Sequence, residues 1–400
     1  NGVPTNIPVL NIDFYPSERG PYNYDLTPNP AFSKGLGADG KLLEPATRWG
    51  GMMRKIESTD FEATNVEYIE FWMMDPFADA PDHKGGEMYF NLGDISEDIL
   101  RDGKKSFENG LPTSELVTDV DTTIWGRVPN LQSLVNAFDN EPASRPYQDV
   151  GYDGLRNADE QTFFDANYLQ QIISLYGAGS QAYIDAANDP SGDDFHYFRG
   201  TDYDNDDQYV SVNLRYKKYQ GPDGNSATAE QNNETYQTLA TTLPNVEDIN
   251  YDNTLWEDET YFQYKIDLRP SKMNIGQNYI ADIYTANSIP LENGELGTVK
   301  WYQFKIPIAD PQKIVGNISD FKSIRFMRMF YKGFEEPIVT RFATFELVRG
   351  DWRRYKYDLL SAGEYIPNDE QSNTKFEIST VNVEENGSKY PVPYVIPPGI

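Results

Sequence analysis

Residues 66–74 read Val-Glu-Tyr-Ile-Glu-Phe-Trp-Met-Met, and this stretch decides the fold class. Side chains alternate along a β-strand, so an extended conformation would place apolar or aromatic groups on both faces. A strand that is apolar on both faces belongs in the middle of a packed sheet. The two faces consist of Ile69, Phe71 and Met73, and of Tyr68, Trp72 and Met74.

Several other stretches show the two-residue period of strands. The first, 87–92, follows turn-forming Pro and Gly residues, which makes a hairpin with residues 66–74 plausible. The period returns late in the chain, where apolar residues alternate with polar ones. These later predicted strands are 262–268, 302–308, 323–331 and 341–348.

Between the two groups of strands the hydrophobic period becomes helical. Apolar residues recur at three- and four-residue spacing in 131–138 and 168–176, a short helix is predicted at 181–187, and residues 229–240 have weak helical character. The order of strands, helices and strands predicts a mainly β protein with an α insertion. We expect one antiparallel β-sandwich, of jelly-roll or galactose-binding type, interrupted by the helices.

Composition and periodicity together divide the chain into five parts. The predicted parts are an extended lead-in rich in Pro, Gly and Asn at 1–48, the first part of the sandwich at 49–128, an insertion of helices and acidic loops at 129–252, the second part of the sandwich at 253–360, and a C-terminal linker at 361–400 with room for one strand at 375–383.

The charge balance excludes several function classes. The chain has 34 Lys and Arg against 63 Asp and Glu, a formal net charge of −29. So acidic a surface repels polyanions, which argues against a nucleic-acid binder.

The chain has no cysteine, which excludes disulfides and thiolate metal sites. With only two histidines, two-histidine metal sites and a Ser-His-Asp triad are nearly excluded, and carboxylate, hydroxyl and amide chemistry remains.

Residues 149–160 match much of the twelve-residue loop that binds calcium in EF-hand proteins. The match is incomplete, because Gly151 occupies position 3, where an acid or amide is expected. The alternative is a helix start with Asp159 or Glu160 in the first turn, facing the positive end of the helix dipole. The candidate Ca²⁺ ligands are Asp149, Asp153, the Leu155 carbonyl, Asn157 and Glu160.

A weaker candidate for calcium is the acidic run at 202–207. Its carboxylates have the spacing of positions 1, 3 and 5, but the turn glycine and the twelfth-position acid are missing. Asp193 and Asp194 could complete this site, although such a run is more often a solvated loop. The candidate ligands are Asp202, Asp204 and Asp206.

Long unusual strings in the chain resemble the SprA family, also called Sov, of gliding motility and type 9 secretion in Bacteroidota. Such strings are more specific than a spaced motif, and the resemblance covers about residues 11–360. The strings are FYPSERGPYNY at 14–24, RWGGMMR at 48–54, EFWMMDPF at 70–77, NLGDISEDIL at 91–100 and HYFRG at 196–200.

The resemblance implies that this chain is a soluble segment of a much longer outer-membrane translocon, a β-barrel that exports folded cargo. The implied partners are the rest of that barrel, a small PorV-like barrel protein, a periplasmic plug protein and secreted cargo with C-terminal secretion domains. The strands here lack the ten-residue alternation of transmembrane barrel strands. We therefore expect an extramembranous location, at the cell surface rather than in the periplasm.

The expected function is that of a noncatalytic module that shapes the export path or docks partners. Two other functions stay open from the residues alone. A β-sandwich with exposed tryptophans could bind carbohydrate by stacking. A glycan hydrolase needs two carboxylates, and 63 acidic residues offer many pairs without selecting one.

Overall fold

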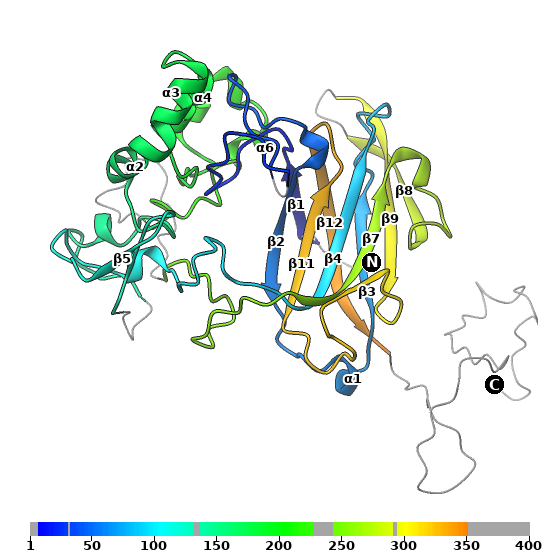
Figure 1. Cartoon of the computed structure of the whole chain (residues 1–400). Helices are drawn as coiled ribbons and strands as arrows, with labels where there is room; N and C mark the ends of the chain where they lie inside the picture. Colours follow the sequence, from blue (N-terminus) through cyan, green and yellow to red (C-terminus); the bar gives the residue numbers. More distant parts are fainter. Residues whose placement is uncertain (1–6, 31–32, 132–136, 227–242, 291–293, 351–400) are drawn as a thin grey trace, which may run out of the picture. The chain divides into compact units, whose positions relative to one another are not determined.

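Strand β3 (Val66–Met74) lies in the middle of a five-stranded antiparallel sheet, as its two apolar faces predict. The computed structural model describes residues 7–30, 33–131, 137–226, 243–290 and 294–350. Two five-stranded antiparallel sheets pack face to face, and an insertion of loops and short helices interrupts them (Figure 1). The predicted β-sandwich with a helical insertion is confirmed.

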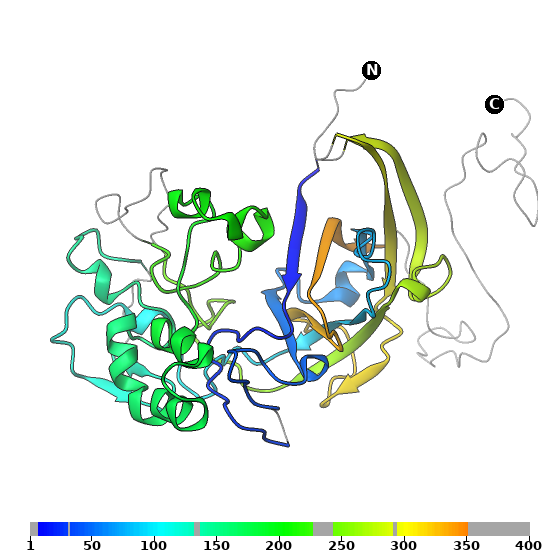
Figure 2. The ribbon, with the colours of Figure 1, turned by 90° about the horizontal axis from the view of Figure 1, so that it is seen from above.

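Each sheet combines strands from both ends of the sequence. Seen from above, the long hairpin of the first sheet, in yellow-green and yellow, is strongly curved (Figure 2). The first sheet has the order β1 (Val9–Phe14), β12 (Ile338–Arg349), β3, β9 (Leu296–Pro307) and β8 (Ile280–Pro290). The second has the order β10 (Lys313–Val315), β7 (Thr260–Leu268), β4 (Gly86–Asp94), β11 (Phe326–Lys332) and β2 (Trp49–Lys55).

Strand β4 does not form a hairpin with β3, so that prediction is wrong. It lies in the opposite sheet, between β7 and β11. The alternation of apolar residues in β4 correctly indicates which face is buried, but it carries no information about the neighbouring strand. The contact between β3 and β4 is instead made across the sandwich, where the rings of Phe71 and Phe90 have centroids 5.7 Å apart.

Phe71 is the centre of an aromatic group between the two sheets. Its ring stacks on that of Phe304 at 5.0 Å between centroids and meets Phe342 and Phe345 edge-on at 5.3 and 5.2 Å. Phe71 has no exposed surface. Offset and edge-to-face rings stabilise a core beyond the area they bury, so this group holds the two sheets together.

The insertion begins earlier than the predicted boundary at 129. The chain leaves the second sheet at Asp94 and returns to it at Thr260, and the two short strands in between pair only with each other within the described residues. The elements are η2 (Glu108–Gly110), β5 (Val120–Thr122), β6 (Arg127–Pro129), η3 (Arg145–Tyr147), α2 (Asn157–Phe163), η4 (Asp165–Leu169), α3 (Gln170–Tyr176), α4 (Gln181–Asn188), α5 (Thr201–Asp204), η5 (Asp207–Tyr209) and α6 (Val212–Arg215).

Two of the predicted helices are confirmed. Residues 168–176 form the end of η4 followed by α3, and 181–187 form α4. Most of the helix predicted at 131–138, the helical stretch at 229–240 and everything predicted after 350 lie outside the described residues. Short helices near the sandwich strands are η1 (Pro45–Thr47), α1 (Phe61–Thr64) and η6 (Pro270–Lys272).

The N-terminal lead-in packs on both parts of the fold. Residues 9–14 are strand β1, which pairs with β12 at the edge of the first sheet. The following residues contribute Leu26, Leu36 and Leu42 to a second hydrophobic cluster, inside the insertion. The other buried members of that cluster are Leu155, Phe164, Tyr168, Leu169, Ile172, Ala182 and Ala186.

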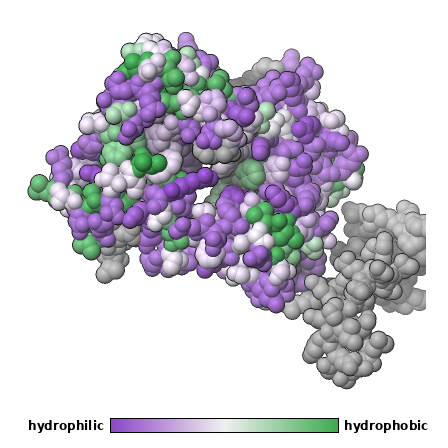
Figure 3. Space-filling model, in the orientation of Figure 1, coloured by the Kyte–Doolittle hydropathy of each residue, from purple (hydrophilic) through white to green (hydrophobic). Residues whose placement is uncertain are grey.

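The molecular surface is consistent with the acidic composition. The face shown in Figure 3 is mostly hydrophilic, with separate hydrophobic patches. Among the described residues, no helix combines the length and apolarity that crossing a membrane requires.

Truncating the central aromatic ring should weaken the sandwich strongly. Phe71→Ala removes a fully buried ring and leaves a cavity, so we expect the free energy of unfolding to fall by about 3–5 kcal/mol in denaturant titrations. Tyr284→Ala is the matched control, because Tyr284 lies in β8 of the same sheet with 60% of its surface exposed. It should cost less than about 1 kcal/mol. Equal losses for both variants would contradict the proposed role of Phe71.

Candidate functional site

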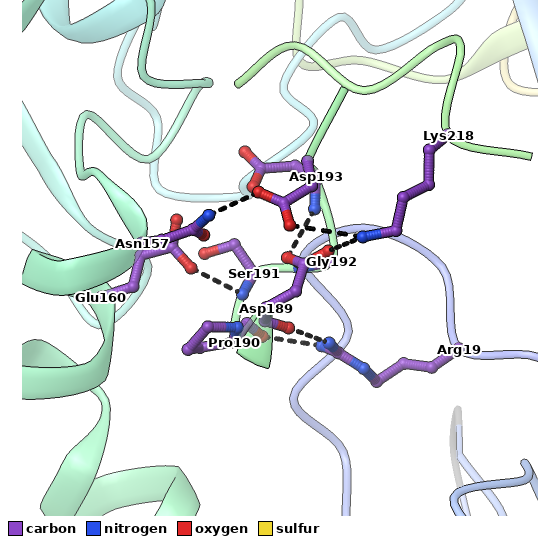
Figure 4. A network of polar contacts seen from close by, with 10 residues as sticks. Arg19, Asn157, Glu160, Asp189, Pro190, Ser191, Gly192, Asp193 and Lys218 are labelled. Atoms are coloured by element: carbon purple, nitrogen blue, oxygen red, sulfur yellow. Dashed lines mark hydrogen bonds and ion pairs between the residues drawn. The ribbon is translucent and has the colours of Figure 1, made fainter. Parts of the chain in front are cut away.

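A tight turn at residues 189–193 organises the polar interior of the insertion. One carboxylate oxygen of Asp189 accepts hydrogen bonds from the amides of Gly192 at 2.7 Å and Asp193 at 3.1 Å. Arg19, from the N-terminal segment, donates to the carbonyls of Asp189 and Pro190 at 2.7 and 2.8 Å (Figure 4). The turn is therefore held both from within and by a distant part of the chain.

Three carboxylates converge beside this turn. Glu160 comes from the first turn of α2, Asp193 from the end of the 189–193 turn, and Asp223 from a later loop. Each offers one oxygen, and the three oxygens lie within 4.8 Å of one another. Asp223 is placed by two backbone hydrogen bonds, from its own amide to the Asp193 carbonyl at 3.1 Å and from the Phe195 amide to its carbonyl at 2.8 Å.

A fourth carboxylate, that of Asp153, lies next to this group. Ser191 connects the two, because its amide donates to Glu160 Oε2 at 3.0 Å and its hydroxyl donates to Asp153 Oδ2. The other oxygen of Asp153 accepts the amide of Leu155 at 3.0 Å. Asp153, Glu160, Asp193 and Asp223 are called the acidic cluster below.

The surroundings of the acidic cluster disfavour the ionised form of its carboxyl groups. Burial is the largest cause that raises the pKa of each member, and neighbouring carboxylates raise it further: to about 8 for Glu160, about 7 for Asp193, about 10 for Asp223 and well above the usual range for Asp153. Within the described residues, no Lys or Arg forms an ion pair with any of the four. Nearby Lys218 pairs instead with Asp189 and Asp194, at 3.1 and 3.3 Å.

The residues predicted as calcium ligands at 149–160 point to different places. Asp153 and Glu160 meet at Ser191, whereas Asp149 Oδ2 accepts the amide of Ser226 at 2.8 Å. Asn157 donates to Asp194 at 2.6 Å. Helix α2 begins at Asn157, and Asp159 and Glu160 stand in its first turn, as the alternative interpretation expected. The side chain of Leu155 is part of the second hydrophobic cluster.

Asp149 also differs from the acidic cluster in its electrostatic surroundings. Burial raises the pKa of Asp149 to about 6, but the guanidinium of Arg145 and nearby backbone amides oppose this shift. Arg145 is itself buried and donates to the carbonyl of Ser226 at 2.6 Å. The negative charge of Asp149 therefore has a positive neighbour, unlike those of the cluster.

The glycine at position 3 of the predicted loop has a structural reason. Gly151 has a positive φ of 74°, and a Cβ there would lie 2.1 Å from Asp193 Oδ2. It would also lie 3.1 Å from the hydroxyl of Tyr22, which donates to the same carboxylate oxygen at 2.7 Å. Gly151 thus leaves room for a carboxylate that is 42 positions later in the chain, since 193 − 151 = 42.

The residues of the weaker candidate do not converge. Asp202 Oδ2 lies 2.8 Å from His196 Nε2, Asp204 pairs with Arg215 at 2.7 Å, and Asp206 accepts the amide of Gln208 at 2.9 Å. The sequence analysis placed Asp193 in this second group, but its carboxylate lies in the acidic cluster. Asp223 was missed altogether, because nothing in its local sequence distinguishes it.

Two other buried acids near the ends of the insertion, Glu97 and Glu247, accept hydrogen bonds from backbone amides. Glu247 accepts hydrogen bonds from the amides of Ile99, Leu100 and Ser106 at 3.0, 3.1 and 2.9 Å. Glu97 accepts the amides of Asn250 and Trp256 at 3.4 and 3.3 Å. These contacts join the segment that leaves the sandwich to the segment that returns to it.

The chain matches a known protein family. Residues 167–400 match the SprA_N family, described as motility related/secretion protein, and this segment is more than half of the chain. The chain belongs to the SprA_N family. The resemblance found in the sequence is thereby confirmed, and the matched segment includes Asp193 and Asp223 but not Asp153 or Glu160. No curated protein matches the chain.

Glu247 should make the stability of this SprA_N family member depend on pH. Burial, and secondarily the charge of Asp98, raise the pKa of Glu247 to about 8, although the amides oppose this. The folded state then holds a proton that the unfolded state loses near pH 4.5, so stability should fall as pH rises from about 5 to 8. Glu247→Gln should reduce this fall by up to about 1.4 kcal/mol per pH unit.

The measurement is a set of denaturant titrations at pH 5, 6, 7 and 8 in chelator, so that no metal contributes. Glu257→Gln, which changes an exposed glutamate, is the control and should retain the wild-type dependence. A Glu247→Gln variant with the unchanged wild-type slope would rule out this role for Glu247.

Proposed function

We propose that the chain is a noncatalytic, extramembranous module of an outer-membrane protein-export channel that serves type 9 secretion and gliding motility. Membership of a motility and secretion family supports this proposal. In it, the sandwich is a rigid platform, and the insertion shapes the export path or docks partners. The proposed location is the cell surface.

The filled interior of the sandwich is the observation that carries the proposal. Along the described strands, the space between the sheets is occupied by packed side chains such as Phe71, Phe90 and Phe345. Protein interiors packed in this way resist deformation. Cargo would therefore pass along the outside of this module, and the conducting pore would be formed by other parts of the channel.

The burial of the acidic cluster supports a role without catalysis. A glycan hydrolase needs two carboxyl groups on either side of a sugar that can reach them. Glu160 and Asp193, which approach each other in the cluster, have no exposed surface. A polysaccharide could not reach either carboxylate without unfolding the insertion.

The surface charge suggests how partners would be selected. With a net charge of −29, the chain would repel acidic proteins and attract basic segments, over a range that salt shortens. The partners we propose are the remainder of the channel, a small PorV-like protein, a periplasmic plug and cargo with C-terminal secretion domains. The exposed apolar residues Tyr284, Ile289 and Leu296 on the β8–β9 hairpin offer one docking position.

Removal of the module should stop export. In the source bacterium, an in-frame chromosomal deletion of residues 7–350 should abolish both the release of cargo into the medium and the spreading of colonies. The rest of the encoded protein must still reach the outer membrane, as checked by immunoblot of membrane fractions. A strain carrying Glu257→Gln, a conservative change at an exposed glutamate, is the control for the engineering itself. Wild-type secretion and spreading in the deletion strain would overturn the proposal.

The proposed location can be tested with a single engineered thiol. The chain has no cysteine, so Tyr284→Cys at an exposed position of β8 would be its only thiol. A membrane-impermeant maleimide should label it in intact cells above the background of the wild type, whose residues 1–400 contain no cysteine. Labelling that appears only after the outer membrane is permeabilised would place the module in the periplasm.

A further inference from the structure

Two carboxylates of the acidic cluster have an oxygen without a hydrogen-bond donor. Glu160 Oε1 and Asp193 Oδ1 are buried and have no partner among the described residues. Both residues are fully buried. A buried, ionised carboxylate without a donor is strongly unfavourable unless a cation compensates for it. Two such oxygens, on members of one group of converging acids, point to a ligand.

From this convergence we infer a calcium site whose ligands are Glu160, Asp193 and Asp223. Their oxygens lie within 4.8 Å of one another. Oxygens on opposite sides of a calcium ion are also about 4.8 Å apart, twice a Ca–O distance of about 2.4 Å. The three side chains can thus surround one ion without rearrangement of the backbone.

The donor set suits calcium in particular. All ligands are carboxylate oxygens, which hard divalent cations prefer, and the cluster contains no histidine or cysteine that would favour zinc or copper. Calcium accepts six to eight oxygens in flexible geometry, and three carboxylates supply up to six. Asp153 keeps Ser191 against Glu160 and adds a nearby negative charge.

This site differs from a contiguous twelve-residue calcium loop. The carboxylate of Asp193 lies where the side chain of position 3 would begin, because Gly151 leaves that space open. Asp149, which would be position 1, is turned toward Ser226 and faces the positive charge of Arg145. The ligands therefore come from α2 and from two later loops, not from one continuous segment.

Such an ion would fasten the insertion at its centre. It would connect α2, the 189–193 turn and the loop at Asp223. The N-terminal segment would be held at the same place, because Tyr22 donates to Asp193 at 2.7 Å and accepts the amide of Tyr152 at 2.9 Å. This role does not depend on the export function proposed above.

Calcium titration of the purified chain, after removal of metal by chelator, tests the inference. Calorimetry should detect one site, and saturating calcium should raise the midpoint of thermal unfolding by on the order of 5 °C. Glu160→Gln and Asp193→Asn should each weaken binding at least tenfold. In chelator these variants should be as stable as wild type or more so, because each replaces a buried carboxyl group, which is costly to ionise, with a neutral amide of the same shape. That combination separates a lost ligand from a misfolded protein.

Two controls decide between this site and its alternatives. Asp202→Asn, in the exposed run at 202–207, should leave both the affinity and the thermal shift unchanged. Asp149→Asn should also preserve binding, whereas a contiguous loop would lose its first ligand. Loss of binding in Asp149→Asn with retention in Asp193→Asn would overturn the inference in favour of the loop. Absence of any calcium effect on the wild type would overturn it outright.

Discussion

Burial of a carboxylate is the constraint that shapes the insertion, because a charge taken out of water must be met by donors or by a cation. Glu97 and Glu247 are met by backbone amides, so each ties together segments that are more than 100 residues apart. Asp149 is met by an amide and faced by the guanidinium of Arg145. In the acidic cluster, Glu160 and Asp193 each have one buried oxygen without a donor among the described residues. A cation at this place would supply the missing compensation.

The sandwich is stabilised in a different way. Its sheets are held by apolar burial and by the rings around Phe71, and its stability should depend little on pH or on divalent ions. The N-terminal segment links the two kinds of structure. Strand β1 extends the first sheet, and Tyr22 then donates to Asp193 within the acidic cluster. A change in the cluster could therefore affect a segment that also contributes an edge strand.

The sequence predicts features that depend on local periodicity. It places β3 in the middle of a sheet, because both faces of residues 66–74 are apolar, and it finds α3 from the helical spacing in 168–176. It does not predict that β4 pairs with β7 and β11, because periodicity reports a buried face and not a partner.

The acidic cluster cannot be predicted from local sequence either, because its members come from separate segments of the chain. Glu160 lies in a recognisable pattern, but Asp193 and Asp223 reach it only through the folded chain. Gly151 was the one local sign, since a missing ligand at position 3 leaves space for a side chain from elsewhere.

Hydrogen–deuterium exchange of the purified chain, in calcium and in chelator, tests most directly whether buried carboxylates and an ion hold the insertion while apolar packing holds the sandwich. Exchange reports the local opening of each segment separately. Calcium should slow exchange at 149–160, 189–195 and 223–226, and leave β3, β4 and β7 unchanged. Equal protection of the sandwich strands, or no change in any of the three insertion segments, would contradict this account.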